Sequence, residues 1–362
     1  MYYLCPMKAL EIRNIKPLLY ALAFAVMVYI GVQILIQWQT FTHIYYPAFY
    51  EKFFPFWSGM FGLIPLSIGD IFYGIILISL LISLYVVIRC FVLKQYWRGF
   101  RILGRWVYIF TFFYILFQFA WGFNYYRPNL YEKFQAEPPS VEQLKTVASK
   151  LQADLVPVRE GLEEDQTGVL YMARDEMRSH FQRRLLQADY RYRYIPKVAI
   201  KKYSLYSFFM RHFGVTGYYN PFSGEAQITR GAPRSILLFS LAHEQAHQMG
   251  YAYEYEANFV GYVSLVESTD PTLRYIGQWR ALQYVLREIY PQDSIFVQEV
   301  VNQYTPGMQR DRAAEKAFAQ KYSGAANDAF GFMNQQYLKR NNQPEGLRSY
   351  NRFVDLLIHR EQ

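Results

Sequence analysis

The chain has little cysteine and little charge. Its 362 residues include only two cysteines, Cys5 and Cys90, and neither belongs to a CxxC motif, so a disulfide framework is excluded. Charged residues make up 19% of the chain, and aromatic residues make up another 19%. A disordered protein lacks the apolar surface that offsets chain entropy, so this composition excludes that class.

Acidic residues are scarcest in the N-terminal third. Residues 1–105 contain nine Lys or Arg and three Asp or Glu, whereas the remaining 257 residues contain 29 and 26, which together give the net charge of +9. A nucleic-acid-binding protein concentrates its excess charge on a folded basic face. Here most of the excess flanks apolar stretches, a pattern typical of membrane topology signals. We therefore expect no nucleic-acid partner.

Three long runs in this part contain no charged residue: Leu18–Ile36, Ile71–Ile88 and Trp106–Phe123. A helix of about 19 residues is about 28 Å long, close to the roughly 30 Å hydrocarbon core of a bilayer. A single run of this kind is also typical of a buried core helix or, at the N-terminus, of a signal peptide. Three runs, with no small-residue cleavage site after the first, predict transmembrane helices at 18–36, 71–88 and 106–123 in a membrane domain, residues 1–123.

Basic residues predict the orientation of these helices. Lys8, Arg13 and Lys16 precede the first run, and the loop Lys94–Arg105 has four basic residues and no acid. Both clusters are expected on the cytoplasmic side, which leaves residues 124–362 outside the cytoplasm. We expect a multi-pass protein of the cell inner (cytoplasmic) membrane, with the lipid bilayer as a partner and its larger domain on the extracytoplasmic side.

The segment Phe53–Ile68 is apolar but contains Pro55, Gly59, Gly62 and Pro65. Such residues argue against a continuous spanning helix, so an interfacial or re-entrant segment is predicted. A fourth span here would invert the topology of everything that follows.

From Asn124 onward the chain is polar, and its apolar residues recur mostly at helical spacing. The loop Glu137–Ser140 is expected to lead into a helix with an N-cap. The fold class is therefore mainly α: N-terminal transmembrane helices, then a mostly helical extramembrane domain with a small sheet. Its expected helices include Val141–Leu162, Gly168–Gln187 and Ala313–Tyr322, and its strand-like stretches are Lys197–Tyr206 and Thr216–Thr229.

The residues that carry chemistry lie in an HExxH motif at His243–His247, directly after the apolar helix expected for Ile236–Ala242. The i, i+4 spacing places both imidazoles on one helical face, where they can share one metal ion. Glu244 lies one step round the helix, where it can hold a metal-activated water rather than the metal. The alternative is a core helix with capping and paired polar residues, which would bury two histidines and a glutamate at a cost.

A catalytic zinc site requires a third protein ligand and an open position. On an uninterrupted helix Glu254 would lie about 10 Å along the axis from His247, so a break is required, and Gly250 is expected to end the first helix. A second helix starting near Tyr253 would turn a carboxylate back toward the metal. Glu254 is preferred because Asn258, one turn later, is placed to hydrogen-bond a ligand. Helix phase leaves other candidates open, namely Glu256, Glu267 and, more weakly, Tyr253.

At these residues the sequence resembles the gluzincin type of zinc metallopeptidase, in which HExxH is followed by a glutamate on a second helix. The pair HExxH and ExxA(D/N), here Glu254, Ala257 and Asn258, is similar to that of membrane-integral prenyl-protein and quality-control endopeptidases. In those enzymes the first glutamate of the second motif is the ligand, which supports Glu254. This chain departs from them in a shorter interval between the motifs and in asparagine for aspartate. They also act within the membrane or at its cytoplasmic side. The resemblance implies a zincin-like fold, α+β with a small sheet.

A second resemblance covers nearly the whole chain. The N-terminal spans, the HExxH segment and three further motifs look like an uncharacterised family of bacterial membrane proteins that carries only a domain-of-unknown-function label. It implies membership and metallopeptidase activity, but no substrate. The three motifs are WGFNYYRP (Trp121–Pro128), YNPFSGEAQ (Tyr219–Gln227) and SYNRFVDLL (Ser349–Leu357).

The strand segment Thr216–Thr229 has two interpretations of equal weight. It is the strand beside an extended substrate that zincin folds use, or two turns that join ordinary strands. Spacing does not single out a donor to a developing oxyanion, and the candidates are Tyr218, Tyr219, Tyr253 and Arg230.

The leading hypothesis is a membrane-anchored zinc metallopeptidase acting on a peptide or protein substrate. His243, His247 and Glu254 would bind Zn²⁺, and Glu244 would serve as general base and then protonate the leaving amine. The alternative is a non-catalytic scaffold or assembly protein whose metal only staples two helices, which a closed four-ligand site would favour. A transporter is a third possibility, but the runs contain no charge pairs and the chain contains no inverted repeat.

Overall fold

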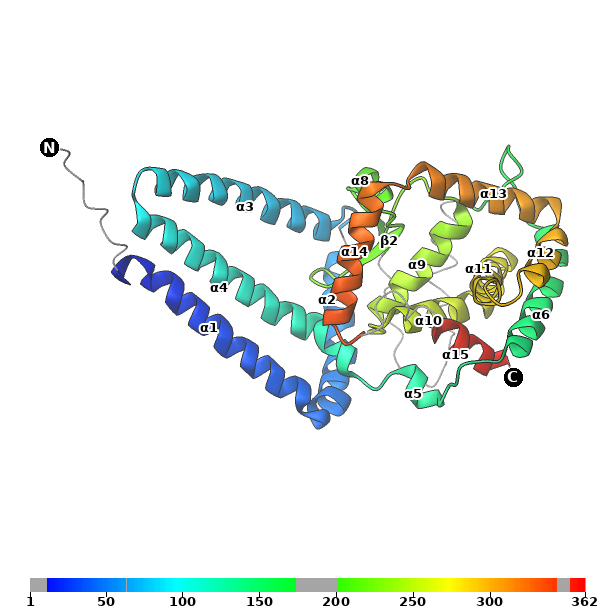
Figure 1. The fold of residues 1–362 in the computed structure, drawn as a ribbon, viewed down its shortest axis with the longest axis horizontal. Helices are drawn as coiled ribbons and strands as arrows, with labels where there is room; N and C mark the ends of the chain where they lie inside the picture. Colours follow the sequence, from blue (N-terminus) through cyan, green and yellow to red (C-terminus); the bar gives the residue numbers. More distant parts are fainter. Residues whose placement is uncertain (1–11, 63, 174–200, 344–351, 362) are drawn as a thin grey trace.

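The computed structural model describes residues 12–62, 64–173, 201–343 and 352–361. Three long helices extend from one end of a mainly helical body (Figure 1). They are α1 (Ile12–Gln37), α3 (Ile68–Val92) and α4 (Tyr96–Ala120), and α4 packs against both of the others. Within the described residues, these are the three helices long and apolar enough to cross a membrane. The predicted spans are confirmed as candidate membrane helices, and each helix is longer than the run that predicted it.

The segment between the first two spans is more helical than its prolines indicate. The π-helix η1 (Phe41–Tyr45) leads into α2 (Tyr46–Gly62), which continues through Pro55. Tyr50 and Phe54 of α2 are buried, and Trp57 Nε1 donates to the carbonyl of Phe222 at 2.9 Å. The first ten residues of the predicted interfacial segment, 53–62, thus belong to a helix packed on the body.

The body is built around α11, which packs against α6, α9 and α10, and Trp279 on α11 is completely buried. The predicted helix at Val141–Leu162 is confirmed as α6, and Ser140 begins it with a capping box. Residues 168–173 form a turn and an extended stretch instead of the expected helix, and 174–187 lie outside the described residues. The helices are η2 (Gly122–Tyr126), α5 (Leu130–Phe134), α6 (Val141–Arg159), α8 (Ser207–His212), α9 (Arg234–Gln248), α10 (Glu254–Val266), α11 (Pro271–Ile289), α12 (Ser294–Asn302), α13 (Pro306–Lys321), α14 (Ala325–Arg340) and α15 (Arg352–Glu361).

A small sheet covers one side of α9. Its strands are β1 (Lys201–Tyr203), β2 (Gly217–Asn220) and β3 (Glu225–Ile228), in the order β1-β3-β2. β1 runs parallel to β3, and β2 runs antiparallel to it. Both predicted strand stretches therefore contain strands, although 197–200 lie outside the described residues. β2 is an edge strand of this sheet.

The sheet is joined to the start of the candidate membrane helix α3 by buried charges. The carboxylate of Glu225 on β3 accepts from the backbone N–H of Ile68 at 3.2 Å and of Gly69 at 2.7 Å. Lys202 on β1 donates to the same carboxylate and to the carbonyls of Phe61 and Leu66. A carboxylate at a helix N-terminus satisfies free N–H groups and complements the helix dipole. The span therefore begins at a fixed point on the sheet.

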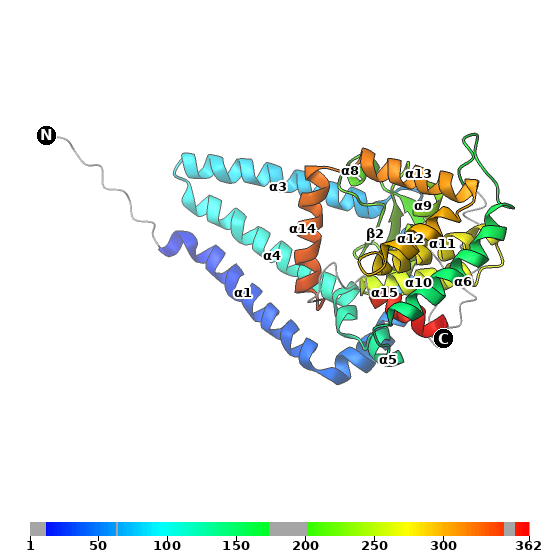
Figure 2. The same ribbon diagram turned by 45° about the vertical axis from the view of Figure 1, so that its right-hand side comes forward.

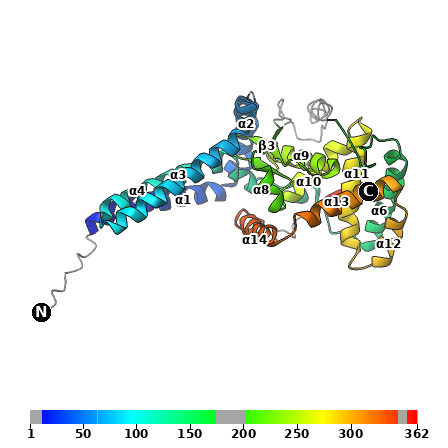
Figure 3. The ribbon, with the colours of Figure 1, turned by 90° about the horizontal axis from the view of Figure 1, so that it is seen from above.

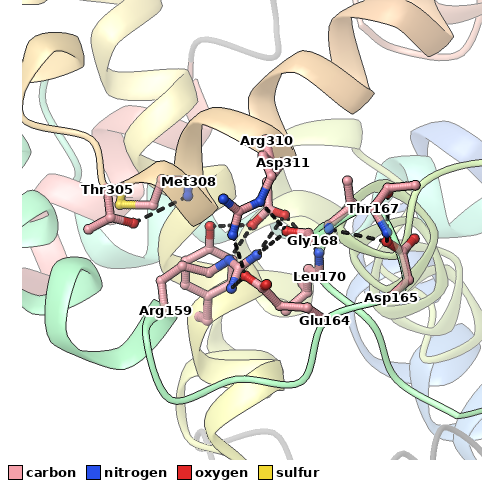
Figure 4. A network of polar contacts seen from close by, with 12 residues as sticks. Arg159, Glu164, Asp165, Thr167, Gly168, Leu170, Thr305, Met308, Arg310 and Asp311 are labelled. Carbon is pink, nitrogen blue, oxygen red and sulfur yellow. Dashed lines mark hydrogen bonds and ion pairs between the residues drawn. The ribbon is translucent and has the colours of Figure 1, made fainter.

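A second buried charge network holds the far side of the body together. Arg159, almost fully buried at the end of α6, donates to both carboxylate oxygens of Asp311 on α13 and to Glu164 (Figure 4). Asp311 also accepts from Tyr275 Oη and from the Leu170 N–H, both at 2.8 Å. Every lone-pair direction of this carboxylate is used, which is the condition under which a buried ion pair is tolerated.

Replacing Asp311 by alanine is expected to lower the free energy of unfolding by about 3–5 kcal/mol, because it leaves the Arg159 guanidinium buried without its main partner. Urea unfolding of the purified full chain in detergent, followed by circular dichroism, measures the change. Lys150→Ala is the control, since it removes an exposed pair with Glu361 and should cost less than about 1 kcal/mol. Equal losses in the two variants would contradict this role.

Candidate metal centre

The candidate centre is formed where α9 ends and α10 begins. α9 ends at Gln248, and Gly250 has a φ of +89°, a left-handed conformation that favours glycine. The Gly250 N–H donates to the His247 carbonyl at 2.8 Å, and the Tyr251 N–H donates to that of Ala246 at 3.2 Å. α10 then starts at Glu254. The expected break at Gly250 and the second helix near Tyr253 are both confirmed.

This reversal brings His243, His247 and Glu254 together. Oε2 of Glu254 lies 3.2 Å from Nε2 of His243 and 3.9 Å from Nε2 of His247. One potential ligand atom from each residue lies within 4.8 Å of the other two. Such a cluster has the size and donor set of a site for one divalent ion.

The alternative third ligands point elsewhere. The carboxylate of Glu256 accepts from the Leu130 N–H at the start of α5, and Glu267 pairs with Arg360 at 3.3 Å. Tyr253 Oη donates to the carbonyl of Tyr125 at 2.8 Å. Of the candidates weighed from the sequence, Glu254 is the one whose carboxylate meets both histidines.

The second nitrogen of each histidine is hydrogen-bonded, and this fixes the tautomer. Nδ1 of His247 donates to the Tyr251 carbonyl at 2.6 Å, and Nδ1 of His243 donates to Oδ1 of Asn258 at 2.8 Å. Because a carbonyl oxygen only accepts, Nδ1 of each ring carries a proton, and Nε2 is the nitrogen that faces Glu254. Metal-binding histidines are held in this way, so the donor set fits a zinc-type ion.

Burial and mutual charge shift the pKa values of the cluster. Burial, reinforced by the neighbouring His243, lowers the pKa of His247 to about 4. Burial also acts to lower the pKa of His243, but the hydrogen bond to Glu254 and the charge of Glu244 outweigh it and raise the value to about 9. His243 is therefore protonated at neutral pH in the absence of a cation, and its Nε2 proton lies toward Glu254, in the place that a bound cation would take.

Glu244 lines a cavity of about 700 Å³ together with the three candidate ligands. Its carboxylate accepts from the backbone N–H of Tyr219 on β2, while burial raises its pKa to about 8. The edge strand β2 forms one wall of the cavity. Other walls come from α3, α4, α11 and α14, through Tyr73, Phe117, Trp121, Arg280, Tyr284, Phe330, Asn334 and Tyr337.

Part of this lining was not identified from the sequence. Tyr218 and Tyr219 do line the cavity, but Arg230 stacks on Tyr203 outside it. Arg280 and Tyr284 lie one turn apart on α11. Many helices that only pack in a core carry such a pair, so this spacing does not identify a site residue. Trp121 belongs to the WGFNYYRP motif. Its ring packs edge to face against the ring of His247, with 5.6 Å between the two ring centroids.

Replacing Asn258 by leucine is expected to weaken zinc affinity about 10- to 100-fold, because His243 loses the acceptor that holds its ring. Asn258→Asp keeps an acceptor and should stay near wild type. Competition with a chromophoric chelator measures the affinity, and Asn302→Leu on α12 is the distant control. Unchanged affinity in Asn258→Leu would show that the contact does not support a ligand.

Comparison with known proteins adds a family but no activity. No curated protein and no solved structure matches the chain. The family described as protein of unknown function (DUF3810) matches residues 45–358. The matched region includes α3, α4, the sheet and the whole candidate centre. The chain belongs to this family.

Proposed function

We propose that the protein is a membrane-anchored zinc metallopeptidase with a zincin-like catalytic domain. The observation that carries the proposal is the convergence of His243, His247 and Glu254 beside Glu244 in a large cavity. The basic clusters before α1 and between α3 and α4 support an extracytoplasmic position for this domain.

Zn²⁺ would be held by His243, His247 and Glu254, and when bound it would supply a Lewis acid at the substrate carbonyl. Glu244 accepts a proton from the attacking water and transfers it to the leaving amine. Its burial suits this role, because a raised pKa favours a carboxyl group that both takes up and releases protons near neutral pH. The Tyr219 N–H fixes the orientation of the carboxylate.

The wall formed by β2 suits an extended peptide. Within the described residues β2 pairs with β3 along one edge, and Gly217 and Tyr219 of β2 lie against Glu244 in the lining of the cavity. A substrate strand added along the other edge would pass the candidate metal centre. Arg280 and Tyr284 line the same cavity and are suitable donors to a developing oxyanion.

The rival hypothesis, a metal that only staples two helices, requires a closed site. Tyr253 and Glu256, the residues that would fill a fourth position, make hydrogen bonds elsewhere. The candidate ligands instead face a cavity large enough for several residues of a peptide. This arrangement favours a catalytic site, which keeps one position open.

The wild-type protein, purified in detergent, is expected to contain about one zinc per chain, and His247→Ala should lose it because one of three ligands is removed. Plasma mass spectrometry measures the metal. His212→Ala is the matched control, since His212 is exposed on α8, away from the candidate centre, and its Nδ1 contacts the carbonyl of Phe208 in the same helix. A wild-type protein without metal, with His247→Ala folded normally, would show that the HExxH motif holds no ion here and would favour a non-enzymatic protein.

Glu244→Gln is expected to retain zinc and to hydrolyse peptides about 10²- to 10⁴-fold more slowly, because glutamine cannot carry the proton. Mass spectrometry of a degenerate peptide library after incubation detects the cleavage. Glu299→Gln, an exposed change on α12, is the control. Full activity in metal-loaded Glu244→Gln would reject the mechanism.

A further inference from the structure

The candidate metal centre lies directly at the end of the membrane helices. Phe117 and Trp121 at the end of α4 and Tyr73 near the start of α3 form one wall of the cavity. Because the Trp121 ring touches the ring of His247, a single aromatic side chain separates the centre from the end of a candidate span. The cavity is therefore close to the bilayer surface on the side of the body.

Helices α8 and α14 expose large apolar side chains beside this cavity. Phe208 and Phe209 on α8 are 60% and 58% exposed, and Phe332 and Met333 on α14 are 65% and 66% exposed. The two helices are in contact through Phe213, the residue that follows α8. Its ring stacks on that of Phe330 of α14, with 5.9 Å between the ring centroids. We call the four exposed side chains the apolar rim.

Helix α14, which carries part of the apolar rim, lies near the place where the candidate spans meet the body. Figures 1 and 2 show α14 crossing beside the body-proximal ends of α3 and α4, and Figure 3 shows it displaced sideways from the three-helix bundle. The lipid-facing side chains of α3, such as Leu77 and Leu81, are exposed in the same way. A bilayer that surrounds the candidate spans would also reach exposed apolar side chains beside them, so the bilayer surface is the occupant assigned to the rim.

Charge on α14 agrees with this assignment. Lys339 and Arg340 are exposed at its C-terminal end. Basic residues beside exposed aromatic and aliphatic groups are typical of helices that lie in the headgroup region of a membrane.

The cavity lies between α14 and the membrane helices. Phe330, Asn334 and Tyr337 of α14 line it together with Tyr73 and Trp121, and Tyr337 meets Trp121 through a side-chain hydrogen bond at one end. A polypeptide that enters between these walls starts from the bilayer surface and reaches Glu254 within a short length of chain. Resting on the proposed peptidase function, we propose that the substrates are membrane-anchored polypeptides, cleaved in the segment that adjoins the anchor.

The first experiment measures the depth of the rim and does not depend on activity. In a Cys5→Ser, Cys90→Ala background, a spin label is attached at Phe332→Cys or at Ile295→Cys, and the full chain is reconstituted in vesicles containing anionic lipid. Ile295, 73% exposed on α12 at the far end of the body, is the matched control. Label 332 should collide more with oxygen and less with a water-soluble nickel chelate than label 295. Identical accessibility at the two positions would overturn the membrane contact.

The second experiment measures where the enzyme cuts. A degenerate peptide is supplied free in solution, directly after a transmembrane anchor of about 20 apolar residues, or after the same anchor and a long Gly/Ser spacer. We expect cleavage within the first residues after the anchor, with kcat/KM at least about tenfold above that of the free peptide. Phe332→Ser/Met333→Ser should slow this cut and leave free-peptide cleavage unchanged, whereas Ile295→Ser should affect neither.

The outcomes separate the two proposals. Cleavage of the free and spacer-linked peptides, without cleavage next to the anchor, would overturn the substrate class and leave the peptidase intact. Cleavage of none of the three by zinc-loaded protein would reject the peptidase and the substrate class together.

Discussion

At Gly250 the chain reverses in a left-handed conformation, and this reversal returns the Glu254 carboxylate to the histidines one helix earlier. Little space is left for any other residue: a β-carbon at position 250 would stand 2.7 Å from Arg127 and 2.9 Å from the ring of Tyr50. Tyr50 in turn donates to the carbonyl of Gln248, the last residue of α9. The turn between the two helices is thus enclosed by side chains from α2 and from the segment that follows α4.

The sequence was informative wherever a local rule decides the structure. Charge-free runs predicted the spans, and Ser140 and Gly250 predicted a helix start and a helix end, because capping and left-handed glycine depend on a few adjacent residues. Asn258 was expected near a ligand and contacts His243. The choice between Glu254 and Glu256 required the geometry of the turn, which no spacing rule supplies.

Long-range packing accounts for what the sequence did not predict. Trp121, Arg280 and Tyr337 meet in one cavity although more than 200 residues separate the first from the last. Pro55 suggested an interrupted segment, yet α2 continues through it because Tyr50 and Phe54 are buried in the core shared with Trp121. Tertiary burial outweighs the local cost of a proline at this position.

The bond between Glu225 and the first turn of α3 has a consequence for how the protein can be handled. A fragment shortened to residues 124–362 would keep Glu225 and Lys202 but lose the Ile68 and Gly69 amides and the Phe61 and Leu66 carbonyls that now satisfy them. It would also expose the face that Tyr50, Phe54 and Trp121 cover. Soluble expression of the body alone would therefore remove structural support from the strand and the helix end that carry the candidate site, and the candidate membrane helices have to be treated as part of the folding unit.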